Sequence, residues 1–114
     1  MIRPWRLTRQ AQSALIEIAE WTVETIGPRQ ADAYEADLIL ACQDIASGRA
    51  ISRDCSSLID DQPAEALCFT RAGQHFIVFV ETDDRVVIID FLHVRSDLPR
   101  RIAALSDLKP GDDR

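Results

Sequence analysis

The sequence has few cysteines and no long apolar run, and both shortages exclude classes of protein. Its three cysteines, Cys42, Cys55 and Cys68, are an odd number spaced 13 residues apart, which fits neither a disulfide framework nor a CxxC metal site. We therefore expect free thiols in a reducing cytoplasm. The apolar runs are far shorter than the ~20 residues of a membrane-spanning helix. No apolar segment follows the charged first residues, so we expect no secretory signal.

Lysine is nearly absent as well. Only Lys109 among the 13 basic residues is a lysine, and 19 acidic residues give a net charge of −6. This balance argues against a general nucleic-acid binder, because phosphate neutralisation supplies most of that affinity; we expect no sequence-specific nucleic-acid binding and no membrane contact. In residues 10–48 seven acidic residues accompany one base, Arg29. We expect a solvated helix face there, with a docking surface for a basic partner as the alternative.

Glycine is also scarce, with four residues and no phosphate-binding loop among them. The two histidines, His75 and His93, do not lie at ligand spacing from each other or from a cysteine or acid, so we expect no metal and no cofactor. We interpret His75 as a hydrogen-bonded structural residue. His93 could take part in acid–base chemistry or anion binding, and Arg71 could stabilise a developing phosphate charge.

The remaining composition, 46% hydrophobic and 28% charged, is typical of a folded globular chain. We expect a single domain over residues 1–114, with residues 109–114 as a frayed tail. The predicted elements are those of an α+β fold. They are an N-terminal strand, an antiparallel helical hairpin, a three-stranded antiparallel meander and a short C-terminal helix.

The first half of the chain predicts the helical hairpin. A strand over 4–7 leads to Thr8, whose hydroxyl can cap a helix, and Gly27-Pro28 can end that helix and begin the next, which runs to about Ser47-Gly48. Apolar stripes at helical period predict the packed faces. The first helix contributes Ala11, Ala14, Leu15, Ile18, Thr22 and Ile26, and the second contributes Ala31, Tyr34, Leu38, Ala41, Cys42 and Ile45.

The second half predicts the sheet. Residues 49–63 lack periodicity, which predicts an irregular connection. Strands are expected over 64–71, 74–81 and 85–93, because the short gaps between them contain the Gly and Asp typical of hairpins. Asp97 can cap a final helix that carries Leu98, Ile102 and Leu105 at helical spacing.

Two strands of the meander are apolar at successive positions, so both of their faces are apolar. The helical hairpin can cover only one face. We expect the other to be a protein–protein site, or else to be covered by the C-terminal helix or by self-association. Together with the second helix's outer positions, this predicts candidate partner-binding residues: Ala33, Ala36, Leu40, Phe76, Val78 and Val80.

Four segments between residues 3 and 105 share the spacing of a known family. They are Arg6-Leu7-Thr8 with Ala11, Ile26-Gly27 with Gln30-Ala31 and Tyr34, Gly73 to Phe79, and Ile88 to Pro99. The last three are similar to W/F-G-x-x-Q-A-x-x-Y, G-x-H-x-I-x-Y and I-x-x-L-H-x-R-x-D. In these motifs and in its element order the chain resembles the RelE/ParE superfamily of bacterial type II toxins, most closely the ParE branch.

The resemblance implies a plasmid-stabilising toxin that inhibits DNA gyrase without being an enzyme and is neutralised by a ParD-like antitoxin in a hetero-oligomer. It points to His93, Arg95, Arg100 and Arg101 as target-binding residues. The RelE branch would instead imply a ribosome-dependent mRNA endoribonuclease, with Arg71 and His93 as its catalytic residues. The acidic composition favours a protein target. Departures from the family pattern at Cys68-Phe69 and Val80-Glu81 leave a third alternative, a non-toxic partner-binding member.

Overall fold

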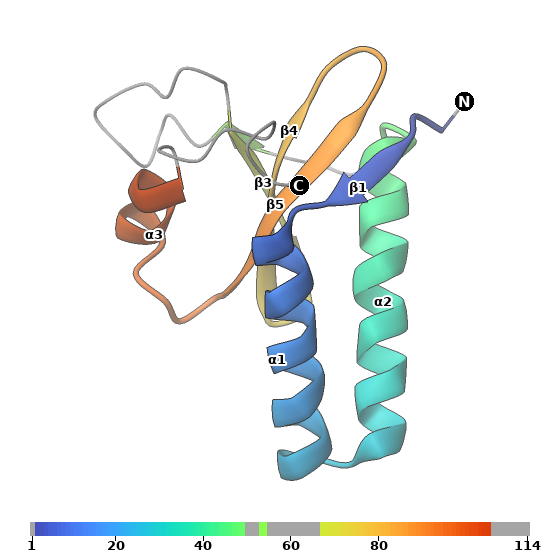
Figure 1. The fold of residues 1–114 in the computed structure, drawn as a ribbon, viewed down its shortest axis with the longest axis vertical. Coiled ribbons are helices and arrows are strands. Elements are labelled where there is room, and N and C mark those ends of the chain that lie inside the picture. The colour runs from blue at the N-terminus through green and yellow to red at the C-terminus, as the bar shows by residue number, and fades with distance from the viewer. Residues whose placement is uncertain (1, 50–52, 55–66, 106–114) are drawn as a thin grey trace.

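The computed structural model describes residues 2–49, 53–54 and 67–105. Helix α1 (Arg9–Thr25) begins at Thr8, whose Oγ1 accepts a hydrogen bond from the Ala11 N–H at 3.1 Å. Helix α2 (Pro28–Ala46) follows after Gly27, which has a φ of 141° and allows the chain to reverse within two residues. The helices lie side by side and antiparallel (Figure 1), as the sequence predicts.

The sheet has five strands in the order β1-β5-β4-β3-β2. Strands β3 (Cys68–Ala72), β4 (His75–Glu81) and β5 (Val86–His93) form the predicted antiparallel meander. Strand β1 (Trp5–Leu7) is parallel to β5 and forms one edge. The turn between β3 and β4 contains Gly73 at a φ of 61°, where L-residues are strained. Helix α3 (Leu98–Leu105) contacts β5.

Of two predictions on the connecting segments, one is partly wrong and the other is confirmed. Part of the predicted irregular connection is wrong, because Arg53 and Asp54 form strand β2 (Arg53–Asp54), which pairs antiparallel with β3. Backbone pairing at a sheet edge needs no hydrophobic period, so the sequence pattern does not reveal it. The predicted cap of α3 is confirmed, since the Asp97 carboxylate accepts a hydrogen bond from the Arg100 N–H at 3.4 Å and its backbone carbonyl accepts one from the Arg101 N–H at 2.9 Å.

Several predictions lie outside the described residues. They concern the rest of the connection between 50 and 63, the start of the first meander strand at 64–66, Cys55, the tail at 109–114, and the side chains of Leu98, Ile102 and Leu105. Cys42 and Cys68 are free thiols, as expected. Burial raises the pKa of Cys42 to about 12, so this thiol acts as a small apolar side chain.

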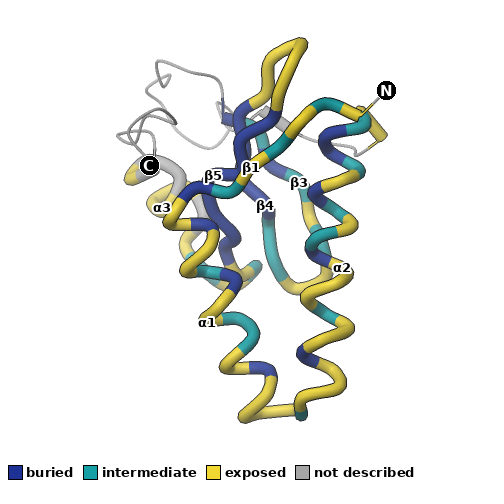
Figure 2. Tube along the Cα trace, turned by 45° about the vertical axis from the view of Figure 1, so that its right-hand side comes forward, coloured by how far each residue is buried: buried dark blue, intermediate teal, exposed yellow. Residues whose placement is uncertain are grey.

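The main core lies between the helical hairpin and one face of the sheet. Its buried members come from both helices and from the inward positions of β4 and β5: Ala11, Leu15, Leu38, Cys42, Ile45, Ala46, Ile77, Phe79, Val86, Ile88 and Phe91. Figure 2 shows buried positions gathered where the helices face the sheet and exposed positions along the end of the hairpin that carries the α1–α2 turn. The hairpin therefore extends beyond the sheet.

The predicted burial of Ile26 is wrong for that reason, because this residue lies at the C-terminal cap of α1, beyond the sheet, and its side chain is 58% exposed. Trp21 and Val23, on the same end of α1, are exposed too. The predicted faces of both helices are otherwise confirmed at the buried positions Ala11, Leu15, Thr22, Ala31, Leu38, Cys42 and Ile45.

The prediction of an exposed second sheet face is also wrong. Val78 is fully buried and Val80 is 9% exposed within the chain. They belong to a second cluster on the opposite face of the sheet, with Leu67, Phe69, Val87, Ile89 and Leu92, and Phe76 packs against it partly buried. A sequence cannot reveal which parts of its own chain cover a sheet face. Within the described part of the chain, no helix is long and apolar enough to cross a membrane.

Candidate functional site

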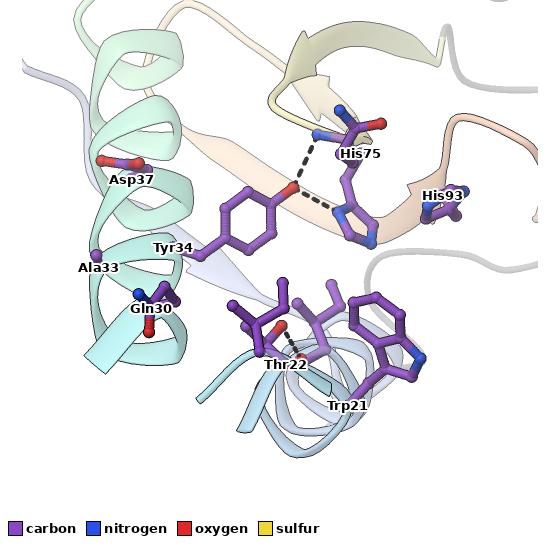
Figure 3. A pocket seen from close by; sticks show the side chains of 11 residues that line it. Trp21, Thr22, Gln30, Ala33, Tyr34, Asp37, His75 and His93 are labelled. Atoms are coloured by element: carbon purple, nitrogen blue, oxygen red, sulfur yellow. Dashed lines mark hydrogen bonds between the residues drawn. The ribbon is translucent and has the colours of Figure 1, made fainter. Parts of the chain in front are cut away.

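A groove opens where the helical hairpin extends past the sheet (Figure 3). It has a volume of about 660 Å³, with walls from α1 and α2 and a floor from the ends of β4 and β5. The α1 wall is mainly apolar, whereas α2 and the floor contribute most of the polar side chains. The lining residues are Ile18, Trp21, Thr22, Ile26, Gln30, Ala33, Tyr34, Asp37, Gln74, His75 and His93. A large apolar hollow with a few convergent polar groups is the usual form of a binding site.

Tyr34 of α2 and His75 of β4 meet where the wall joins the floor. The Tyr34 Oη lies 2.6 Å from Nδ1 of His75 and accepts a hydrogen bond from the Gln74 N–H at 2.9 Å. We assign the phenol proton to the contact with His75, because the Ala72 carbonyl is the more distant acceptor at 3.4 Å. This arrangement assigns the proton of neutral His75 to Nε2.

Both groups are neutral near pH 7. Burial, with a smaller contribution from the neighbouring His93, lowers the pKa of His75 from 6.5 to about 4. Burial is also the main reason why the pKa of Tyr34 is raised above its usual 10.0. The interpretation of His75 as a hydrogen-bonded structural histidine agrees with this geometry.

Gly73 makes room for the Tyr34 ring. A Cβ at this position would lie 2.7 Å from Cε1 of Tyr34 and 2.9 Å from its hydroxyl oxygen. The position also has a φ of 61°, which favours glycine. The β3–β4 turn and α2 can therefore meet closely only with glycine at 73.

His93 closes the floor and begins the turn toward α3. Its ring packs edge-to-face on His75, with ring centroids 5.2 Å apart. Its Nδ1 accepts a hydrogen bond from the Arg95 N–H at 3.0 Å. The predicted target-binding residues Arg95, Arg100 and Arg101 are all exposed on the segment that follows. Of these three arginines, Arg95 is bonded directly to His93, through its backbone N–H.

The structure does not bring Arg71 and His93 together. The register pairs Arg71 with Phe76, which packs against the second cluster, whereas His93 pairs with His75 on the floor of the groove. Because side chains alternate along strands, Arg71 and His93 start from opposite faces of the sheet. The Nε of Arg71 donates to the Gly73 carbonyl at 3.0 Å. The positive charge of Arg71 also opposes the rise in the pKa of Tyr34, so its guanidinium lies within electrostatic range of the groove.

Asp90 is a buried acid that no motif of the sequence marks as a site residue. Only 1% of it is exposed, and its carboxylate accepts hydrogen bonds from the Phe91 N–H at 2.8 Å and from Nε2 of Gln10 at 3.3 Å. Burial raises its pKa above the usual value. It lines a second hollow of about 340 Å³ together with His93 and Arg101. A lone acid inside an apolar strand was the signal that could have marked it.

The predicted partner-binding residues divide between the two layers. Ala33, Ala36 and Leu40 are exposed on α2, with Leu40 56% exposed, as predicted for an outward face. Ala33 also lines the groove. Within the described residues no group of three or more His, Cys, Asp or Glu side chains could hold a metal ion.

An N-terminal strand, a helical hairpin and an antiparallel meander in this order define the α+β class of RelE/ParE-like toxins. The sequence matches the model of the ParE toxin of the type II toxin–antitoxin system parDE over residues 5–98. The chain therefore belongs to the ParE toxin family. No curated protein matches the chain.

Solved structures agree on the fold. A chain of the chromosomal ParDE TA system from P. aeruginosa superimposes with a TM-score of 0.64 at 15% sequence identity. The similarity covers 82% of this chain and 98% of that one. At this identity the likeness concerns the fold, which agrees with the family to which the sequence belongs.

Proposed function

We propose that this chain is the toxin of a type II pair, that it inhibits DNA gyrase by binding it, and that a ParD-like antitoxin encoded beside it holds it inactive in the cytoplasm. Membership of the ParE toxin family over residues 5–98 is the observation that carries the proposal. In this proposal the chain acts by occupying its target and not by catalysis.

Two features of the chain support inhibition by binding. The residues that a nuclease of the related branch would use, Arg71 and His93, start from opposite faces of the sheet. The net charge of −6 repels a phosphate backbone at long range. The exposed Arg95, Arg100 and Arg101 supply a local basic segment that suits a protein surface with acidic side chains.

The test compares two activities of the same purified chain. Gyrase and relaxed plasmid are incubated with increasing chain, and translating ribosomes with a defined mRNA are incubated with the same amounts. Inhibited supercoiling with intact mRNA supports the proposal. Cleaved mRNA with normal supercoiling would assign the chain to the ribosome-dependent nucleases. The absence of both activities, together with stable binding to the neighbour-encoded protein, would make it a non-toxic partner-binding member.

A further inference from the structure

His93 holds the turn between β5 and α3 through its side chain. Its Nδ1 accepts the Arg95 N–H at 3.0 Å, and its carbonyl oxygen accepts the Ser96 N–H at 3.0 Å and the Ser96 Oγ–H at 2.6 Å. A side-chain acceptor that binds the N–H two residues later has the geometry of an Asx turn, which Asn or Asp usually provides. Here an imidazole nitrogen occupies the acceptor position.

The His93 imidazole is held in place by residues that line the groove. It packs edge-to-face on His75 at 5.2 Å between centroids, and Tyr34 of α2 holds His75 through a 2.6 Å hydrogen bond. The next residue, Val94, donates its N–H to the Gln74 carbonyl at 3.0 Å. A continuous series of contacts therefore runs from α2 through both histidines to the turn.

We propose that His93 is a positioning residue for the arginine-bearing segment from Arg95 to Arg101. Its Nδ1 fixes the turn that presents Arg95 and leads to the Asp97 cap of α3, the helix that carries Arg100 and Arg101. This inference rests on the proposed function, because it takes those arginines to bind the target. It assigns the role to the acceptor at Nδ1, with the ring proton on Nε2, and gives no acid–base step to the imidazole.

The physical reason is preorganisation. A turn that is already fixed in the free chain has little conformational entropy left to lose when the target binds. The chain therefore binds the target with higher affinity. Without the acceptor the Arg95 N–H is exposed and pairs with water, while the backbone bonds of Val94 and Ser96 remain, so the fold survives and Arg95 loses the contact that fixes it. The effect should therefore fall on target inhibition more than on stability.

Three variants separate this role from catalysis by the ring. His93→Asn keeps an acceptor, Oδ1, at the place of Nδ1 and can close a true Asx turn on the Arg95 N–H. His93→Gln has an acceptor one bond further out, and His93→Ala has none. We expect inhibition of gyrase to weaken roughly fivefold or more in the Gln and Ala variants, the effect of one net hydrogen bond, and Asn to restore it to within about twofold of the parent.

Amide hydrogen exchange at Arg95, followed by NMR on the purified chain, reports on the turn without reference to any target. Exchange should be slow in the parent and in His93→Asn, and faster in His93→Gln and His93→Ala. Unchanged exchange in the Ala and Gln variants would overturn the inference. Equal loss of inhibition in all three variants would overturn it too, because the ring itself would then be required.

A failure of the proposed function gives a different result from a failure of the positioning role. If the parent does not inhibit gyrase, growth arrest on induced expression replaces supercoiling as the functional readout, since it depends on no particular target. The same order of variants, with Asn close to the parent and Gln and Ala weaker, would then support positioning toward another target. Growth arrest that is equal in all four proteins would contradict it. Thermal unfolding of each variant serves as the control for folding.

Discussion

The hydroxyl of Tyr34 lies 2.6 Å from Nδ1 of His75, and this contact joins α2 to β4 across 41 residues of sequence. The same oxygen accepts the Gln74 N–H at 2.9 Å, so one side chain satisfies two groups at the turn between β3 and β4. Both partners line the groove. The contact thereby fixes the hairpin, the turn and the floor of the candidate site relative to one another.

Removing the hydroxyl should cost stability. Tyr34→Phe leaves His75 Nδ1 without its donor, and we expect a loss of about 1 kcal/mol in the free energy of unfolding, measured by urea denaturation. A cycle with His75→Ala gives the control. If the two residues act through this bond, the double variant should lose less than the sum of the single losses. Strict additivity would mean that the bond contributes nothing.

The pH dependence of stability should reveal His75. Its pKa is lowered to about 4 in the folded chain, whereas the unfolded chain binds the proton near the usual 6.5. The unfolded state therefore binds more protons as pH falls below 6.5, and stability that is complete above this value declines toward pH 4. Because the ring is half-buried, we expect a loss of only about 1 kcal/mol. Asp90, with its raised pKa, titrates in the opposite sense and offsets part of it.

His75→Asn isolates this contribution, because an amide oxygen can accept from Tyr34 and does not titrate in this range. Urea denaturation at several pH values between neutral and mildly acidic should give a flatter profile for the variant than for the parent. Parallel profiles would show that His75 has the same pKa in both states.

A comparison of two glycines separates two contributions to the free energy of unfolding. One is the steric cost of a close contact, and the other is the strain of a positive φ. Gly73 and Gly48 both have positive φ, 61° and 80°, but a Cβ would meet Tyr34 at 2.7 Å in the first case and nothing within 4 Å in the second. Gly48→Ala should cost about 1 kcal/mol from strain alone, and Gly73→Ala about 2–4 kcal/mol, measured by denaturation. Equal losses would mean that the Tyr34 ring moves aside freely.

The outer face of α2 gives a prediction about the antitoxin. Leu40 is 56% exposed on α2 and Ile16 is 60% exposed on α1, so Leu40→Glu and Ile16→Glu change similar amounts of apolar surface. If the antitoxin covers the predicted face, Leu40→Glu should weaken binding of the neighbour-encoded protein roughly tenfold or more, measured by calorimetry. Ile16→Glu should change it little. The reverse order would place the interface on α1.

Local signals predicted most of the fold. The Thr8 cap, the Gly27-Pro28 reversal and the Asp97 cap depend on residues within one turn of the chain, and each lies where the sequence predicts it. The two-residue strand at Arg53 depends instead on a neighbouring strand. The burial of Val78 and Val80 depends on what covers the sheet. These tertiary effects have no periodic signature.

The candidate site was predictable in its parts and not as a whole. Tyr34 and His75 each stand in a motif that the resemblance singles out, yet nothing in the sequence places them in contact. Ile26 and Trp21 form exposed walls of the groove because the C-terminal end of α1 extends past the edge of the sheet. How far it extends depends on how the helical layer is offset from the sheet. Distances between segments far apart in sequence decide such sites.

The proposal that an arginine-bearing segment inhibits gyrase is tested most directly by a matched pair of charge reversals in a supercoiling assay. Arg95→Glu/Arg100→Glu alters two exposed arginines at the turn and α3, and Arg29→Glu/Arg85→Glu makes the same change in net charge at two exposed positions elsewhere. We expect the parent and the second variant to inhibit gyrase at similar concentrations, and the first to lose at least about tenfold in potency. Equal potency of the two variants, or a parent that leaves supercoiling unchanged, would contradict the account.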